Sequence, residues 1–193
     1  MVDGAYHAFL WQDGAARDLG TLSGPSLAVG GPSSRPWAIN DDGVIVGTSN
    51  GRAVLWRNGV ISDLGSPRGK VAKAAALNDR GQVVGSIVTS AGYEHASLWQ
   101  NGAMRDLGTL GGKLTYSYAN AVNQQGQIIG QCYGASGSLQ RAFVWQNGVM
   151  SDLTLGGPYS NAVAINERGQ IIGRSTTRNG DRHAVLWTLR RGT

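Results

Sequence analysis

Short apolar runs return at a regular interval along the chain, and polar, turn-forming residues separate them. One run ends in tryptophan, and its copies place that residue at Trp11, Trp56, Trp99, Trp145 and Trp187. Consecutive copies are 45, 43, 46 and 42 residues apart. This spacing predicts that the chain is built from a repeat of about 45 residues.

Three further series keep phase with the tryptophans. An Asp-Leu pair begins at Asp18, Asp63, Asp106 and Asp152. A second segment starts with alanine and has asparagine as its last residue, at Asn40, Asn78, Asn123 and Asn166. An apolar pair is followed by Gly47, Gly85, Gly130 and Gly173. We name the four segments of each repeat the Asn, Gly, Trp and Asp strands, in that order.

Turn-forming dipeptides join these segments in pairs. Asn58-Gly59 follows one Trp strand, and Asp42-Gly43 follows one Asn strand. Dipeptides of this kind favour the positive φ values of tight hairpins. No stretch of a dozen residues has helical spacing of apolar positions without a glycine interruption. The chain is predicted to be all-β: a β-propeller-like ring of four four-stranded antiparallel blades, with five blades as the alternative.

The chain is predicted to form a single repeat domain, residues 1–193. The approximate repeats are 7–52, 53–95, 96–141 and 142–183, and 184–193 form a terminal strand. The Trp strand occurs five times and the other strands four times. The surplus copy could close the ring, form part of a fifth blade, or pair with another chain, because an open strand edge invites pairing.

Composition excludes several classes of protein. With 193 residues and 41% hydrophobic residues, the chain can bury a core. The net charge is +5, but the basic residues are scattered and Arg190-Arg191 is their only adjacent pair, so we expect no nucleic-acid partner. Cys132 stands alone, which excludes an internal disulfide. No 18-residue apolar run predicts a membrane span, and no signal peptide is visible at Met1.

Three motifs carry a resemblance to a known family. They are His7-Ala8-Phe9-Leu10-Trp11, Asp106-Leu107-Gly108-Thr109-Leu110-Gly111-Gly112 and Ala164-Ile165-Asn166-Glu167-Arg168-Gly169-Gln170-Ile171-Ile172-Gly173. They resemble the bacterial HAF repeat, which is named for its His-Ala-Phe signature. Arg52 and Arg141 depart from the pattern where it has histidine, and Ser66-Pro67-Arg68-Gly69 replaces its Thr-Leu-Gly-Gly segment. The resemblance implies an extracellular or cell-surface location and brings no established chemistry with it.

The residues shared by all repeats are expected to be structural. The residue before each Trp strand is cationic or an imidazole: His7, Arg52, His95, Arg141 and His183. We interpret this series as satisfying local hydrogen bonds, and the Asp and Asn series as capping turns. The Trp series is expected to form the core between blades rather than a sugar-stacking platform. We therefore predict no metal site, no cofactor and no catalytic residue.

Function is expected where the copies differ, in the long connections before the Trp strand and after the Asp strand. Tyrosine beside Asn, Ser and Gly in these connections is typical of binding surfaces. Trp37 stands where the other repeats have Ala75, Asn120 and Val163, and it would stack on a ligand if exposed. The candidate ligand-binding residues are Arg35, Trp37, Lys73, Tyr93, Glu94, His95, Tyr116, Tyr118, Tyr133, Tyr159, Arg178 and Asp181.

Three functions remain open. The favoured one is a non-catalytic binding module for a carbohydrate or another polar surface ligand. The second is a small-molecule enzyme with its site at the propeller axis, using residues such as Glu94 and Lys73. No nucleophile elbow, phosphate loop or zinc signature supports it. The third is a structural or adhesive segment of a larger repeat protein, which includes self-association through a terminal strand.

Overall fold

The computed structural model describes residues 6–27 and 32–189 of the chain. Within these residues the protein is all-β, as predicted, and the one helical element is a single 3-10 turn at Pro67–Gly69. The Arg190-Arg191 pair and the end of the predicted terminal segment 184–193 lie outside the described residues.

The strands form a hairpin and four larger units in chain order. The terminal hairpin is β1 (Phe9–Gln12) and β2 (Ala15–Asp18). Unit 1 is β3 (Ser34–Ile39), β4 (Ile45–Ser49), β5 (Arg52–Arg57) and β6 (Val60–Asp63). Unit 2 is β7 (Ala72–Leu77), β8 (Val83–Val88), β9 (Glu94–Gln100) and β10 (Ala103–Gly108). Unit 3 is β11 (Leu114–Val122), β12 (Ile128–Gly134), β13 (Gln140–Gln146) and β14 (Val149–Leu153). Unit 4 is β15 (Gly156–Ile165), β16 (Gln170–Thr177) and β17 (Arg182–Thr188).

All pairing within a unit is antiparallel between consecutive strands. A single parallel pairing, Gln140 with Tyr159, joins units 3 and 4 into one seven-stranded sheet. The dipeptide turns after the Trp strands have the predicted geometry. Asn58 and Gly59, for example, have φ values of 51° and 77°, the combination that a tight hairpin with right-handed twist requires.

A β-bulge recurs in the first strand of every unit. The register between the first and second strands shifts by one residue at Trp37, Ala75, Asn120 and Val163. The glycine of the second strand explains why this arrangement is tolerated. A Cβ on Gly85 would overlap the backbone oxygen of Lys73, and Gly47, Gly130 and Gly173 face the first strand of their own unit in the same way. The repeated glycine therefore serves close backbone approach rather than a turn.

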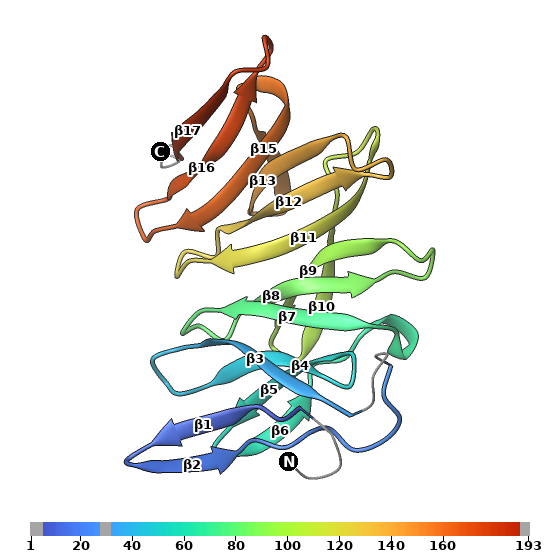
Figure 1. Cartoon of the computed structure of the whole chain (residues 1–193), viewed down its shortest axis with the longest axis vertical. Coiled ribbons are helices and arrows are strands. Elements are labelled where there is room, and N and C mark those ends of the chain that lie inside the picture. The colour runs from blue at the N-terminus through green and yellow to red at the C-terminus, as the bar shows by residue number, and fades with distance from the viewer. Residues whose placement is uncertain (1–5, 28–31, 190–193) are drawn as a thin grey trace.

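The units stack face to face, and each interface holds its own apolar cluster (Figure 1). The face of unit 2 that is directed toward unit 3 contributes Val84 and Leu98, which pack with Ile128 and Phe143 of unit 3. Trp56, Trp99 and Trp145 are buried in successive interfaces, as predicted for the Trp series. Trp11 departs from that prediction and is 71% exposed, since no described unit precedes the terminal hairpin.

The structure does not show a closed ring. The terminal hairpin and unit 4 lie at opposite ends of the long axis of the molecule, with the units arranged between them in chain order (Figure 1). The class that the structure supports is an all-β stack of antiparallel sheets.

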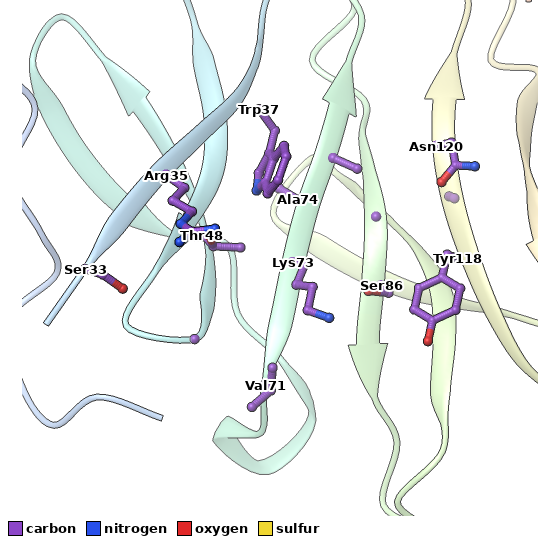
Figure 2. A pocket seen from close by; sticks show the side chains of 14 residues that line it. Ser33, Arg35, Trp37, Thr48, Val71, Lys73, Ala74, Ser86, Tyr118 and Asn120 are labelled. Atoms are coloured by element: carbon purple, nitrogen blue, oxygen red, sulfur yellow. The ribbon is translucent and has the colours of Figure 1, made fainter. Parts of the chain in front are cut away.

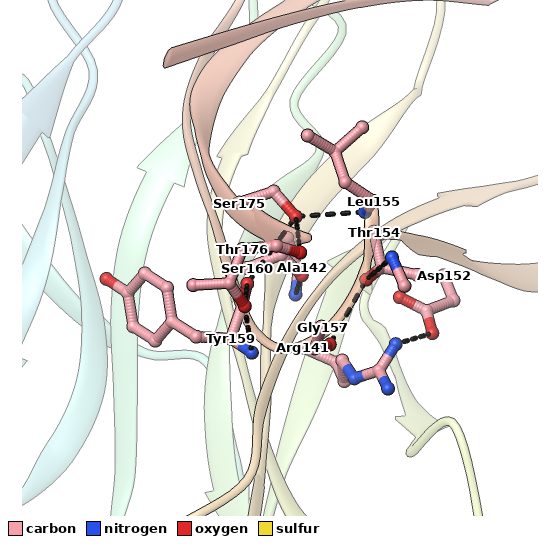
Figure 3. Close-up of polar contacts among 11 residues, drawn as sticks. Arg141, Ala142, Asp152, Thr154, Leu155, Gly157, Tyr159, Ser160, Ser175 and Thr176 are labelled. Atoms are coloured by element: carbon pink, nitrogen blue, oxygen red, sulfur yellow. Dashed lines mark hydrogen bonds and ion pairs between the residues drawn. The ribbon is translucent and has the colours of Figure 1, made fainter. Parts of the chain in front are cut away.

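The shared polar residues perform structural roles. Asp18, Asp63 and Asp106 each accept a hydrogen bond from the glycine or turn N–H two residues later. Each of these carboxylates also pairs with the cationic or imidazole residue of the same sheet, as do Arg141 and Asp152 at 2.9 Å (Figure 3). These contacts agree with the capping and hydrogen-bonding roles predicted from the sequence.

The asparagines add a contact that runs between units. Asn123 Oδ1 accepts hydrogen bonds from the N–H groups of Gln125 and Gln127, which caps the turn. Its Nδ2 donates to the backbone oxygen of Asn166 in unit 4 at 3.0 Å, and Asn78 Nδ2 donates in the same way to Asn123 at 2.9 Å. Together with Asn40 these residues form an asparagine ladder along the stack.

Candidate functional site

A pocket of about 500 Å³ lies where the first strands of units 1, 2 and 3 run beside one another (Figure 2). We call it the inner-strand pocket. Arg35 and Trp37 come from β3, Lys73 from β7 and Tyr118 from β11, so four of the sequence-predicted residues line one pocket. Its walls also include Ser33, Thr48, Gly51, Val71, Ala74, Ala75, Gly85, Ser86, Ala119 and Asn120.

The repeated strand register places these residues. Arg35, Lys73 and Tyr118 occupy equivalent positions, because each pairs with the residue directly after the glycine of its own second strand. Trp37 and Asn120 are the corresponding bulge residues. A bulge redirects a side chain that regular alternation would aim elsewhere. The pocket is therefore lined by positions that are structurally equivalent but chemically different from unit to unit.

The two cationic side chains of the pocket differ in whether they have an ion-pair partner among the described residues. Lys73 Nζ lies 3.1 Å from Glu94 Oε1, and Ser86 donates its hydroxyl to the same carboxylate oxygen at 2.6 Å. Arg35 has no ion pair with any residue that the structure describes. Its guanidinium is the cation of the pocket that is left to bind an anionic group of a ligand.

Aromatic side chains border the pocket on two sides. Trp37 is 60% exposed. Exposure is the condition under which Trp37 was expected to stack on a ligand. Tyr118 packs edge to face against Tyr133, with ring centroids 5.6 Å apart. Burial, followed by the nearby Glu94 carboxylate, raises the pKa of Tyr118 to about 12. Its phenol therefore stays protonated at neutral pH, with a hydrogen bond to Glu94 among the causes of the raised pKa.

Three other predicted site residues are not among the lining residues of the pocket. Tyr93 and Tyr116 form a second edge-to-face pair, with centroids 5.7 Å apart. Glu94 joins the pocket through its contacts with Lys73 and Ser86.

Tyr159 belongs to a separate hollow of about 360 Å³ at unit 4, which Arg174, Ser175, Arg182, His183 and Ala184 also line. The backbone around Tyr159 is fixed by polar side chains of β16. Thr176 Oγ1 accepts a hydrogen bond from the Tyr159 N–H at 3.1 Å (Figure 3).

Seven predicted site residues line neither hollow: Tyr93, Glu94, Tyr116 and Tyr133, described above, and His95, Arg178 and Asp181. His95 faces Asp106, with Nδ1 3.0 Å from the carboxylate, and so belongs to the structural pairs. Arg178 and Asp181 lie in the exposed turn between β16 and β17, where Asp181 and Thr177 hydrogen-bond each other. The structure does not bring these residues to the inner-strand pocket.

Several wall residues could not be identified from the sequence pattern, and other residues lie in elements that the pattern did not predict. Seven candidates that were expected in loops lie within strands instead, because the strands extend further than the apolar pattern indicates. They are Arg35 in β3, Lys73 in β7, Glu94 in β9, Tyr116 and Tyr118 in β11, Tyr133 in β12 and Tyr159 in β15. Ser86 and Asn120 were not singled out. Ser86 directly follows the repeated glycine of its unit, and Asn120 is the bulge residue of its unit. These positions identify the two residues as wall residues only once the strand register is known.

The described residues hold no group of three or more His, Cys, Asp or Glu side chains arranged to bind a metal ion. Cys132 is buried, and burial raises the pKa of its thiol to about 11, which keeps it protonated and weakly nucleophilic. Across residues 6–27 and 32–189, no helix has the length and apolarity needed to cross a membrane.

No protein-family model and no curated protein sequence matches this chain.

Proposed function

We propose that the protein is a non-catalytic binding module whose inner-strand pocket takes a carbohydrate, with preference for one that carries an acidic group. The observation that carries the proposal is the exposed Trp37 on the same strand as Arg35, which has no ion-pair partner among the described residues. An indole face stacks on the apolar face of a sugar ring, and a guanidinium pairs with a carboxylate through two parallel hydrogen bonds.

The remaining wall chemistry supports binding over catalysis. The walls supply hydroxyl and amide groups from Ser33, Thr48 and Asn120, which suit the hydroxyls of a sugar. The acidic neighbour, Glu94, already accepts hydrogen bonds from Lys73 and Ser86. A general acid–base mechanism needs a titrating group within reach of the substrate, and His95 is held by Asp106 instead.

The HAF-repeat resemblance and a cell-surface location remain part of this proposal. A propeller-like ring also remains a proposal. The stacked units and their adjacent first strands favour it, but closure would require contacts between the two ends of the stack.

Binding is tested with a glycan array that contains neutral and acidic sugars, followed by calorimetry on the strongest ligand. Trp37→Ala is expected to weaken the affinity by about tenfold or more, since a stacking anchor contributes about 1.4 kcal/mol or more. Arg35→Ala is expected to weaken acidic ligands by a similar factor and to leave their neutral analogues nearly unaffected.

Two control variants separate the site from general effects of losing a side chain. Trp11→Ala removes another exposed tryptophan at the N-terminal end of the stack, and Arg57→Ala removes an exposed arginine of β5. Both should bind like the unaltered chain. Equal losses in Trp37→Ala and Trp11→Ala, or no glycan bound at all, would reject the proposal.

A further inference from the structure

The last sheet of the stack exposes an apolar face. Within unit 4, Ile172 is 52% exposed and Leu186 is 59% exposed, and the adjacent bulge residue Val163 is 58% exposed. Together with Ala184, these side chains border a shallow hollow. We call this surface the leading face of unit 4. No residue that the structure describes covers it.

The interfaces inside the chain show what covers such a face. The equivalents of Ile172 and Leu186 in unit 3 are Ile129 and Val144, which are buried against Ala162 and Ile171 of unit 4. In unit 2 they are Val84 and Leu98, buried against unit 3. The leading face is thus covered in each preceding unit by the next unit of the same kind.

The other end of the stack exposes the complementary surface. Phe9 and Trp11 of the terminal hairpin are 59% and 71% exposed. Their equivalents in unit 3, Phe143 and Trp145, pack against the leading face of the preceding unit. We call Phe9 and Trp11 the trailing surface.

We propose that the leading face of unit 4 binds the trailing surface of a second copy of this chain, so that copies associate head to tail. This contact continues the unit-to-unit interface that the chain already forms between its own sheets. One molecule carries the leading face at one end of its long axis and the Trp-strand part of the trailing half, in the terminal hairpin, at the other end (Figure 1). The contact is heterologous, since different surfaces of the two copies meet.

β17 adds a second incomplete feature at the same end. In units 1 to 3 the Trp strand pairs with an outer Asp strand, but within residues 6–27 and 32–189 β17 pairs only with β16. His183 accordingly lacks the carboxylate that His95 and Arg141 find in their own units, within the described residues. Among the described residues, the outer edge of β17 is therefore unpaired, which is the kind of edge that can pair with another strand.

The test uses sedimentation velocity on the full chain over a range of concentrations. Leu186→Arg blocks the leading face, and Trp11→Arg blocks the trailing surface. Each variant alone is expected to lose about tenfold or more in self-association affinity. It should therefore sediment as a monomer at concentrations at which the unaltered chain associates. An equimolar mixture of the two is expected to form one-to-one dimers and nothing larger, because the mixture retains a single compatible pair of surfaces.

Val60→Arg serves as the matched control. Val60 is exposed on β6, away from the leading face and the trailing surface, and this variant should associate like the unaltered chain. Circular dichroism checks that all three variants fold. The proposal is overturned if the unaltered chain is monomeric up to roughly 100 µM, an upper limit for a weak specific contact. It is also overturned if Leu186→Arg abolishes association while Trp11→Arg does not, which would indicate a symmetric contact between two leading faces.

Discussion

At the scale of the residue, identical positions carry different roles according to which neighbour they have. Trp56 is 1% exposed, and its indole N–H donates to the backbone oxygen of Leu19 at 2.9 Å. Trp11 occupies the same position in the repeat and faces solvent. The amino-acid type therefore identifies the position within a repeat, and the presence of a preceding unit decides whether the side chain stabilises the fold.

Trp56→Ala is expected to lower the free energy of unfolding by about 3–5 kcal/mol, because it leaves a large cavity in an interface between units. Trp11→Ala should lower it by less than about 1 kcal/mol, since the side chain is already hydrated. Urea denaturation of the two variants measures the difference. Equal losses would contradict the burial of Trp56.

The pKa of Tyr118 makes a further prediction about alkaline pH. A tyrosine in the unfolded chain loses its proton near pH 10, whereas in the folded protein Tyr118 keeps it up to about 12. Between these values the folded state binds more protons than the unfolded state, so stability falls as the pH rises through this window. Tyr118→Phe should show a smaller drop in melting temperature between pH 10 and 12. An identical drop in the variant would show that Tyr118 has an ordinary pKa.

At the scale of the element, the hairpins could be predicted from the sequence and the bulges could not. Dipeptides such as Asn58-Gly59 specify φ locally, so the turn is encoded in two residues. The bulge at Ala75 depends on the pairing of β7 with β8 and on the close approach of Lys73 to Gly85. This dependence on a neighbouring strand is why the sequence identified Lys73 and Tyr118 as candidates but misplaced them in loops.

Gly85→Ala is expected to destabilise the protein by about 2 kcal/mol or more, because the new Cβ overlaps backbone rather than a side chain that can move. It should also weaken ligand binding, since Lys73 and Ala75 would shift. Gly81→Ala is the matched control: its surroundings are open, so its positive φ alone should cost about 1 kcal/mol. Thermal denaturation and calorimetry of both variants provide the comparison. A loss no larger in Gly85→Ala than in Gly81→Ala would contradict the close approach.

At the scale of the whole molecule, the sequence predicted a propeller-like ring of antiparallel sheets, and the structure shows the antiparallel sheets but not a closed ring. The apolar series specifies which faces meet, and the clusters between units follow it closely. Ring closure depends on the angle between neighbouring units summed along the chain, and no single residue encodes that angle. In the structure, the two ends of the described chain lie far apart rather than side by side (Figure 1).

The asparagine ladder is expected to couple the opening of neighbouring units. Asn123→Ala removes the donor to Asn166, so unit 4 should open more often while unit 1 is unaffected. Hydrogen exchange would show faster exchange of the β15–β17 amides than of the β3–β6 amides, relative to the unaltered chain. A uniform change over all units would indicate global destabilisation instead.

The asparagine ladder also has a consequence for the evolution of a protein built from such units. Asn40, Asn78 and Asn123 each bond to their own turn and to the backbone of the next unit. A backbone oxygen is present whatever the side chains of that next unit are. A duplicated or deleted unit would consequently find its connections already in place on both sides, and the inner-strand residues could diverge without disturbing them. Such a lineage could lengthen its chain by tandem duplication and diversify its ligands at the same time.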